Sequence, residues 1–124
     1  MPAPPPDMSR INLGARGETI ARNFLEAKGY QFLDANFRCH YGEIDLIFKD
    51  GGTVVFVEVK TRKYLAQGLP EEAVTPRKLS HISRVGQFYL IAQNLLDKPA
   101  RIDVVAIEMI TNPPTIRHLQ NVSQ

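Results

Sequence analysis

The sequence contains few of the residues that form disulfides, bind structural metals or span a membrane. Its 124 residues include one cysteine, Cys39, which excludes an internal disulfide framework and suits a reducing cytoplasm. The histidines, His40, His81 and His118, are too scattered to indicate a zinc site. No apolar run approaches the ~20 residues of a membrane helix, and the N-terminus lacks the charged and apolar regions of a signal peptide. We therefore expect a cytoplasmic protein with no membrane partner.

The overall composition is ordinary for a globular domain. Hydrophobic residues make up 44% of the chain and charged residues 23%. A chain of this length can bury roughly two-thirds of the surface that it exposes when unfolded. The proline-rich segment 1–11 predicts a disordered arm. We expect one domain over residues 12–112 and an irregular C-terminal tail over residues 113–124.

Hydrophobic periodicity and turn residues predict the order of the secondary structure. The expected elements are a helix at 14–28, strands at 30–38, 42–49 and 53–60, a helix starting at Pro76 and a strand at 101–110. Short links make the first three strands an antiparallel meander, and the second helix allows a right-handed parallel crossover to the fourth strand. The pattern therefore predicts an α/β fold with a mixed sheet and an α-β-β-β-α-β order.

Two charged residues, Glu58 and Lys60, interrupt the valine-rich segment "VVFVEVKTR". A two-residue turn at Gly51-Gly52 would place Asp45 opposite Glu58 and Glu43 opposite Lys60, with all four side chains on one sheet face. A turn one residue earlier would make Asp45 and Glu58 diagonal neighbours. Like charges this close destabilise a sheet. A divalent cation would offset that repulsion, so the pattern indicates a metal site.

The residue types around this hairpin suit phosphodiester cleavage. Mg²⁺ takes one or two carboxylates, waters and phosphate oxygens, so Asp45 and Glu58 are the candidate ligands of Mg²⁺ or Mn²⁺. Lys60 is placed to orient or deprotonate water, or to stabilise developing charge. Glu18 lies at the edge of the apolar stripe of the first helix and is a further candidate. Its alternative role is a solvated pair with Arg22 at i+4.

A basic segment follows the predicted acids. Six basic and two acidic residues lie between positions 60 and 84, whereas the net charge of the whole chain is +2. Such a segment attracts a polyanion, although a solvated loop and helix face is an equally simple interpretation. No aromatic stacking platform for single strands is evident, so we expect phosphate contacts and shape recognition. The candidate nucleic-acid-binding residues are Arg62, Lys63, Arg77, Lys78 and Arg84.

Three motifs together resemble a known family. "GARGETIA" at 14–21, "GEIDLI" at 42–47 and "VFVEVKTR" at 55–62 are similar to the YraN-like family of small bacterial proteins. The fold of that family resembles the archaeal Holliday junction resolvases of the PD-(D/E)XK nuclease superfamily. The resemblance covers roughly residues 12 to 110 and implies a restriction-endonuclease-like, resolvase-like core. It also implies metal binding by Asp45 and Glu58, a catalytic role for Lys60, and a helix-one glutamate at Glu18.

The motifs leave two main hypotheses. The first is a metal-dependent endonuclease acting on structured or branched DNA in repair or recombination. The second is a non-catalytic nucleic-acid-binding or assembly protein of nuclease ancestry. A hydrolase of a small phosphate compound is a weaker third hypothesis, because the basic segment favours a polyanion. The sequence leaves open whether the protein forms a homodimer.

Overall fold

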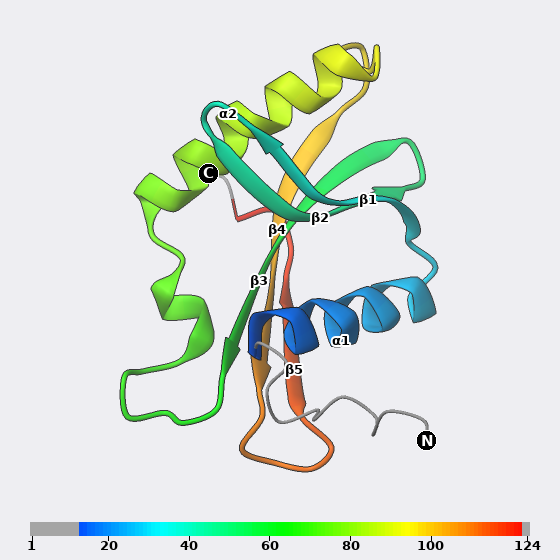
Figure 1. Cartoon of the computed structure of the whole chain (residues 1–124). Helices are drawn as coiled ribbons and strands as arrows, with labels where there is room; N and C mark the ends of the chain where they lie inside the picture. Colours follow the sequence, from blue (N-terminus) through cyan, green and yellow to red (C-terminus); the bar gives the residue numbers. More distant parts are fainter. Residues whose placement is uncertain (1–12, 123–124) are drawn as a thin grey trace, which may run out of the picture.

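The computed structural model describes residues 13–122 and shows one five-stranded sheet with two α-helices (Figure 1). The elements are α1 (Leu13–Ala27), β1 (Gln31–Cys39), β2 (Gly42–Asp50), β3 (Thr53–Arg62), the 3₁₀ helix η2 (Pro70–Ala73), α2 (Pro76–Ala92), β4 (Ala100–Glu108) and β5 (Thr115–Leu119). The strands lie in chain order, with β3 and β4 parallel and the other neighbours antiparallel. The predicted α/β fold and its α-β-β-β-α-β order are confirmed. The arm predicted at 1–11 lies outside the described residues.

The prediction of an irregular tail over 113–124 is wrong, because β5 adds a fifth strand to the sheet along β4. Polar residues break the strand pattern in this segment, but each has a partner in the fold. Arg117 Nε donates to Glu71 at 2.7 Å, and His118 Nε2 lies 2.8 Å from Asp103 Oδ2. These side-chain partners are distant in sequence, so local patterning does not reveal the strand.

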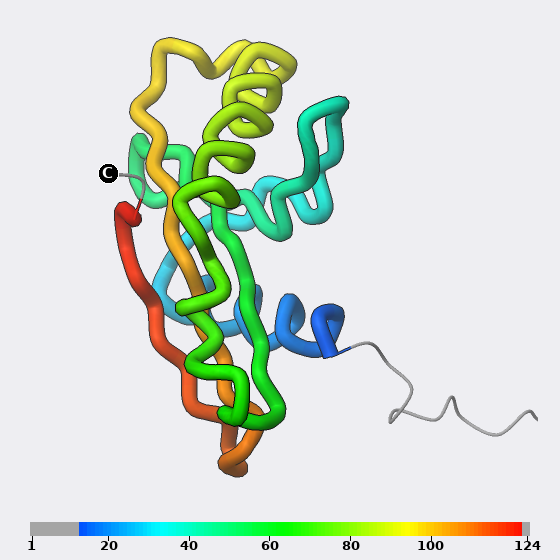
Figure 2. The backbone as a smooth tube through the Cα atoms, turned by 90° about the vertical axis from the view of Figure 1, so that its left-hand side faces the viewer, coloured from blue at the N-terminus to red at the C-terminus, as the bar shows by residue number. Residues whose placement is uncertain are grey.

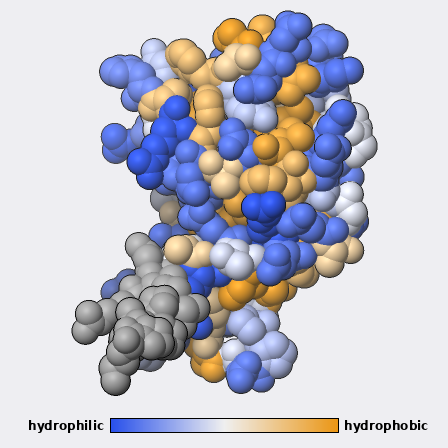
Figure 3. Space-filling view, turned by 45° about the vertical axis from the view of Figure 1, so that its right-hand side comes forward, coloured by the Kyte–Doolittle hydropathy of each residue, from blue (hydrophilic) through white to orange (hydrophobic). Residues whose placement is uncertain are grey.

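The core consists of two layers of buried side chains, one on each face of the sheet. Figure 2 draws the backbone of α1 and α2, the helices that pack on these layers. Alternate residues of β3 point to opposite faces, so Val55 and Val57 pack under α1 whereas Val54 and Phe56 pack under α2. Because both faces are covered, β3 reads as a nearly continuous hydrophobic run. On the side drawn in Figure 3, hydrophobic patches are interrupted by hydrophilic side chains. Within residues 13–122, no helix has both the length and the apolar character needed to cross a bilayer.

The β1–β2 hairpin bends sharply midway along its length. Ile44 packs in the layer under α2, whereas Leu46, two residues later, packs in the layer under α1. Regular alternation would put both on one face, so the strand changes orientation at Asp45. In β1, Asn36 adopts a left-handed φ of 54° at the same level, a conformation that asparagine tolerates better than most residues. The bend carries residues 37–44, the hairpin tip, against α2 (Figures 1 and 2).

We predict that Gly86→Ala destabilises the protein although alanine is the better helix former. A Cβ at Gly86 would lie 2.6 Å from Cε2 of the buried Phe56 ring, and overpacking of this kind costs about 1–3 kcal/mol. That cost exceeds the ~1 kcal/mol that replacing a helical glycine would contribute. Urea denaturation should show the loss, and Ser80→Ala, an exposed position on α2, should show none. Equal or higher stability of Gly86→Ala would contradict the close packing of α2 on β3.

Candidate functional site

The site forms where β2 leaves the β3 ladder. The two strands pair from Asp50↔Thr53 to Leu46↔Val57, which confirms the register predicted from the Gly51-Gly52 turn. Beyond that point the backbone pairing stops, and the N–H of Val59 donates instead to Asp45 Oδ2 at 2.8 Å. The carboxylate of Asp45 therefore takes the place of a ladder carbonyl. This exchange draws the side chain of Asp45 to the backbone of β3.

The predicted pairing of Glu43 with Lys60 is wrong. The β2–β3 register does not extend to these residues. Glu43 instead lies opposite Arg38 of β1, whose Nε donates to Glu43 Oε2 at 3.1 Å. The bend in β2 explains the difference, because it turns the end of the strand away from β3.

Asp45 and Glu58, the acid pair, are brought together as the sequence predicts. The Glu58 side chain donates a hydrogen bond to the Asp45 carboxylate, and Glu58 is only 7% exposed. Burial, followed by the charge of Asp45, raises the pKa of Glu58 to about 8. Burial also raises the pKa of Asp45, against the lowering effect of the Val59 N–H. At neutral pH the acid pair therefore shares one proton and carries about one negative charge.

Two lysines supply positive charge to the acid pair. Lys78, in the first turn of α2, places its Nζ 3.8 Å from Glu58 Oε1. Lys60 lies two residues after Glu58 in a regular part of β3, so both side chains leave the sheet on the same face. The charges of Lys78 and Lys60 both act to lower the pKa of Glu58, but burial and Asp45 outweigh them. Lys78 was predicted only as a nucleic-acid contact, and the structure places it at the acid pair.

Glu18 belongs to the same neighbourhood. Burial, followed by the charge of Asp45, raises the pKa of Glu18. In the amide orientation that satisfies its neighbours, Asn36 donates to Glu18 Oε1 at 3.1 Å. The alternative pairing of Glu18 with Arg22 is not formed, because Arg22 Nε bonds Glu26 at 3.0 Å. The structure thus brings Glu18 toward Asp45, as the sequence predicts.

Asn36 is a site residue that sequence reasoning missed. It lies opposite Asp45 in the β1–β2 register, between the pairs Ala35↔Leu46 and Phe37↔Ile44. Its amide also donates to Glu43 Oε1 at 2.9 Å, so it links the acid of α1 to an acid of β2. The sequence signal that could have revealed Asn36 is the presence of an asparagine inside a predicted strand, where this residue type is rare.

The donor chemistry fits a hard divalent cation with few protein ligands. Across residues 13–122, no group of three or more His, Cys, Asp or Glu side chains is arranged to hold a metal ion. Mg²⁺ needs only one or two carboxylates, since waters and phosphate oxygens complete its octahedron. The acid pair meets that requirement, and its oxygen-only donors favour Mg²⁺ or Mn²⁺ over softer metals. A cation there would replace the shared proton.

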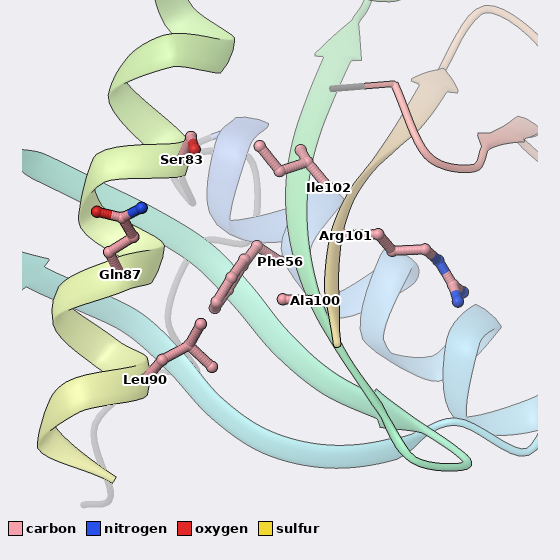
Figure 4. A pocket seen from close by; sticks show the side chains of 7 residues that line it. All are labelled: Phe56, Ser83, Gln87, Leu90, Ala100, Arg101 and Ile102. Atoms are coloured by element: carbon pink, nitrogen blue, oxygen red, sulfur yellow. The ribbon is translucent and has the colours of Figure 1, made fainter. Parts of the chain in front are cut away.

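The five predicted nucleic-acid-binding residues come from β3, the loop that follows it and α2. Lys63, in that loop, and Arg77, on α2, are exposed. Arg62 has a buried Nε with no hydrogen-bond partner. Arg84 holds its guanidinium 5.0 Å from the centroid of the Tyr41 ring. A surface pocket between α2 and the strands β3 and β4 contains none of the acids of the site (Figure 4). It is lined by Phe56, Ser83, Gln87, Leu90, Ala100, Arg101 and Ile102.

A second buried acid, Asp103, has a structural role. It is fully buried and bonds Arg101 Nε at 3.0 Å, His118 Nε2 at 2.8 Å and the N–H of Asn121 at 3.0 Å. Burial raises its pKa, but the hydrogen bonds from His118, Asn121 and Arg101 outweigh burial and lower the pKa overall. These bonds fasten β5 and the chain after it to β4.

Comparison with known proteins identifies the family of the chain. A model of the uncharacterised protein family UPF0102 matches residues 17–107, a range that includes the acid pair, Lys60 and Glu18. The chain belongs to this family. It is 46% identical over 110 residues to the UPF0102 protein GSU0650 of Geobacter sulfurreducens, covering 88% of this chain and 86% of the relative. A UPF0102 protein of Chlorobaculum parvum is 50% identical over 98 residues, covering 77% and 74%. The predicted resemblance to the YraN-like family is confirmed.

We predict that Glu58→Gln removes a pH dependence of stability. The pKa of Glu58 is about 8 in the folded protein against about 4.5 when unfolded, so the native state holds the extra proton between these values. In chelator, the parent should therefore lose stability as pH rises from 5 to 9, by an amount on the order of 3 kcal/mol. Glutamine does not titrate, so the variant should lack this loss.

The measurement is urea denaturation in EDTA at pH 5, 7 and 9. Glu26→Gln, at an exposed acid of α1, is the matched control and should follow the parent. Parallel pH profiles for the parent and Glu58→Gln would show that Glu58 is ionised in the folded protein.

Proposed function

We propose that this protein is a metal-dependent nuclease that hydrolyses phosphodiester bonds in DNA. The observation that carries the proposal is the acid pair, in which Glu58 is buried and Asp45 is half-buried, flanked by Lys60 and Lys78. A fold selected only for stability gains nothing from two neighbouring carboxyl groups removed from water, since one apolar replacement would remove the repulsion. Two neighbouring carboxyl groups would instead be useful for binding a cation that assists phosphate chemistry.

The residues divide the chemistry among them. When bound, Mg²⁺ or Mn²⁺ would polarise the scissile phosphate and make a bound water more acidic; Asp45 and Glu58 would hold it. The Val59 N–H keeps the Asp45 carboxylate fixed, so little reorganisation is needed. To serve as a ligand, Glu58 would release its proton to solvent. Lys60, on the same face of β3, stabilises the negative charge that develops on the phosphate or positions the attacking water.

Lys78 and Glu18 complete the surroundings. In the free protein Lys78 offsets the single negative charge of the acid pair, and the Lys78 ammonium can also pair with an entering phosphate. Asn36 holds Glu18 in the neighbourhood of Asp45, where Glu18 would accept a hydrogen bond from a water bound to the metal. We assign it a positioning role.

The proposed substrate is DNA, with structured or branched forms in repair or recombination as the specific proposal. The resemblance to the resolvase-like branch supports this choice, and so do the exposed basic residues Lys63 and Arg77. The alternative is a nucleic-acid-binding protein of nuclease ancestry without catalysis. Junction, flap, duplex and single-stranded DNA, each incubated with Mg²⁺, with Mn²⁺ and with EDTA, distinguish the two.

We predict that Asp45→Asn abolishes metal-dependent cleavage while DNA binding survives. Asparagine keeps an oxygen for the Val59 N–H but removes a charge from the metal site, so in EDTA the variant should melt no lower than the parent. Adding Mg²⁺ or Mn²⁺ should raise the melting temperature of the parent only, because a ligand bound by the native state stabilises it by mass action.

Melting curves and a cleavage assay on the same preparations test this. Asp34→Asn, in β1 and outside the acid pair, is the control that should retain metal stabilisation and cleavage. A parent that is neither stabilised by metal nor active on any of the four DNAs would favour the non-catalytic alternative. A strongly destabilised Asp45→Asn in EDTA would make Asp45 a structural residue.

We also predict that Lys63→Ala and Arg77→Ala weaken DNA binding and flatten its salt dependence. Each lost phosphate contact lowers the slope of log affinity against log salt by about one unit. Lys98→Ala, beyond the C-terminal end of α2, should leave the slope unchanged. Binding isotherms between 50 and 200 mM salt measure the effect. Unchanged slopes in both variants would place the DNA elsewhere.

A further inference from the structure

An exposed aromatic pair lies where the hairpin tip meets α2. The rings of Tyr41, in the β1–β2 turn, and Phe88, on α2, have centroids 5.3 Å apart. Their residues remain 42% and 44% exposed, although rings that serve only packing are usually buried. Arg84 lies over the Tyr41 ring at 5.0 Å. We call Tyr41, Phe88 and Arg84 the aromatic platform.

The surroundings of the aromatic platform carry positive charge. Helix α2 contains Arg77, Lys78 and Arg84 and no aspartate or glutamate. Arg84 and Phe88 are exposed and lie on one side of α2, because they are four residues apart. Lys78 lies in the first turn of α2 beside Glu58. A ligand that extends along α2 from the acid pair therefore meets Lys78 first and Phe88 nearly three turns further on.

The aromatic platform is within a few nucleotides of the acid pair. Tyr41 and Asp45 are four residues apart on the hairpin, a span of at most ~13 Å at ~3.3 Å per residue. A nucleic-acid strand advances ~3.4 Å per base along a duplex. At most about four stacked bases thus separate a phosphate at the acid pair from a base at Tyr41.

From these observations we propose that the aromatic platform binds an unpaired base of the nucleic acid whose phosphodiester lies at the acid pair. Paired bases are stacked within the duplex and do not present a face, whereas a base in a single strand, flap or branch point can stack on an aromatic ring. The arginine adds cation–π and stacking contact to the same base. The proposal rests on the proposed function for its substrate, and it narrows that substrate to DNA with unpaired nucleotides.

The aromatic platform could not be recognised in the sequence. Tyr41 and Phe88 are 47 positions apart, and Tyr41 lies between two predicted strands whereas Phe88 lies in the predicted second helix. The bend at Asp45 and Asn36 brings them together. Packing of Phe37 against Tyr89, with centroids 5.2 Å apart, holds the tip in place beneath the platform.

The test is binding in EDTA, so that catalysis does not enter the result. The probes are a 12-nucleotide DNA single strand carrying 2-aminopurine and a blunt 12-base-pair duplex of the same sequence. Tyr41→Leu and Phe88→Leu should each weaken single-strand binding about ten-fold, reduce quenching of 2-aminopurine and leave duplex binding unchanged. Tyr41→Phe should behave as the parent. Tyr64→Leu, at a 72% exposed ring on the loop after β3, is the control that should have no effect.

Each other outcome overturns the proposal. Single-strand binding equal to that of the parent in both leucine variants would exclude stacking. Equal loss of single-strand and duplex binding would reduce the aromatic platform to a support for the hairpin tip. Loss of self-association with unchanged DNA binding would make it an interface between copies of the chain. If the parent cleaves DNA but the leucine variants bind single strands as the parent does, the proposed nuclease function would hold and the aromatic platform would be rejected. If the parent binds neither DNA, both proposals would be overturned.

Discussion

The hydrogen bond from the Val59 N–H to the Asp45 carboxylate is the interaction on which the site depends. A strand that ends its backbone pairing inside a sheet leaves a donor that burial does not tolerate. Asp45 satisfies this donor with its side chain, and its own backbone is then free to turn with β2. One bond therefore accounts for three features: the end of the β2–β3 ladder, the position of Asp45 beside Glu58, and the swing of the hairpin tip toward α2.

The arrangement has an energetic cost that the rest of the fold offsets. Two carboxylates ~5 Å apart repel by roughly 3 kcal/mol at an effective dielectric near 20. The protein avoids most of this repulsion by keeping a proton on Glu58, whose pKa is raised to about 8. The hydrophobic layers on both sides of β3 hold the strand regardless of this local cost. Stability from the core thus permits two neighbouring acids that cannot both ionise without this cost.

Most of the fold and the central acids were predictable because they follow from local patterns. The Gly51-Gly52 turn fixes the register of β2 and β3, and that register alone is enough to bring Asp45 near Glu58. The predicted pair Glu43 and Lys60 failed because regular alternation was extended through a bend that no periodicity reveals. The strand β5 was missed for a related reason, since Arg117 and His118 are satisfied by partners that only the folded chain supplies.

Helix α2 explains why the long-range features coincide. Its buried side is fixed on the sheet by Ile82, Val85 and Tyr89 and by the absence of a side chain at Gly86. With that side fixed, the 3.6-residue period also fixes where Lys78 and Phe88 are exposed. The same docking thus sets Lys78 at the acid pair and Phe88 at the hairpin tip. A shift of α2 by one residue along the sheet would break both contacts. The packing of the buried face of the helix therefore determines the geometry of the polar surface beside it.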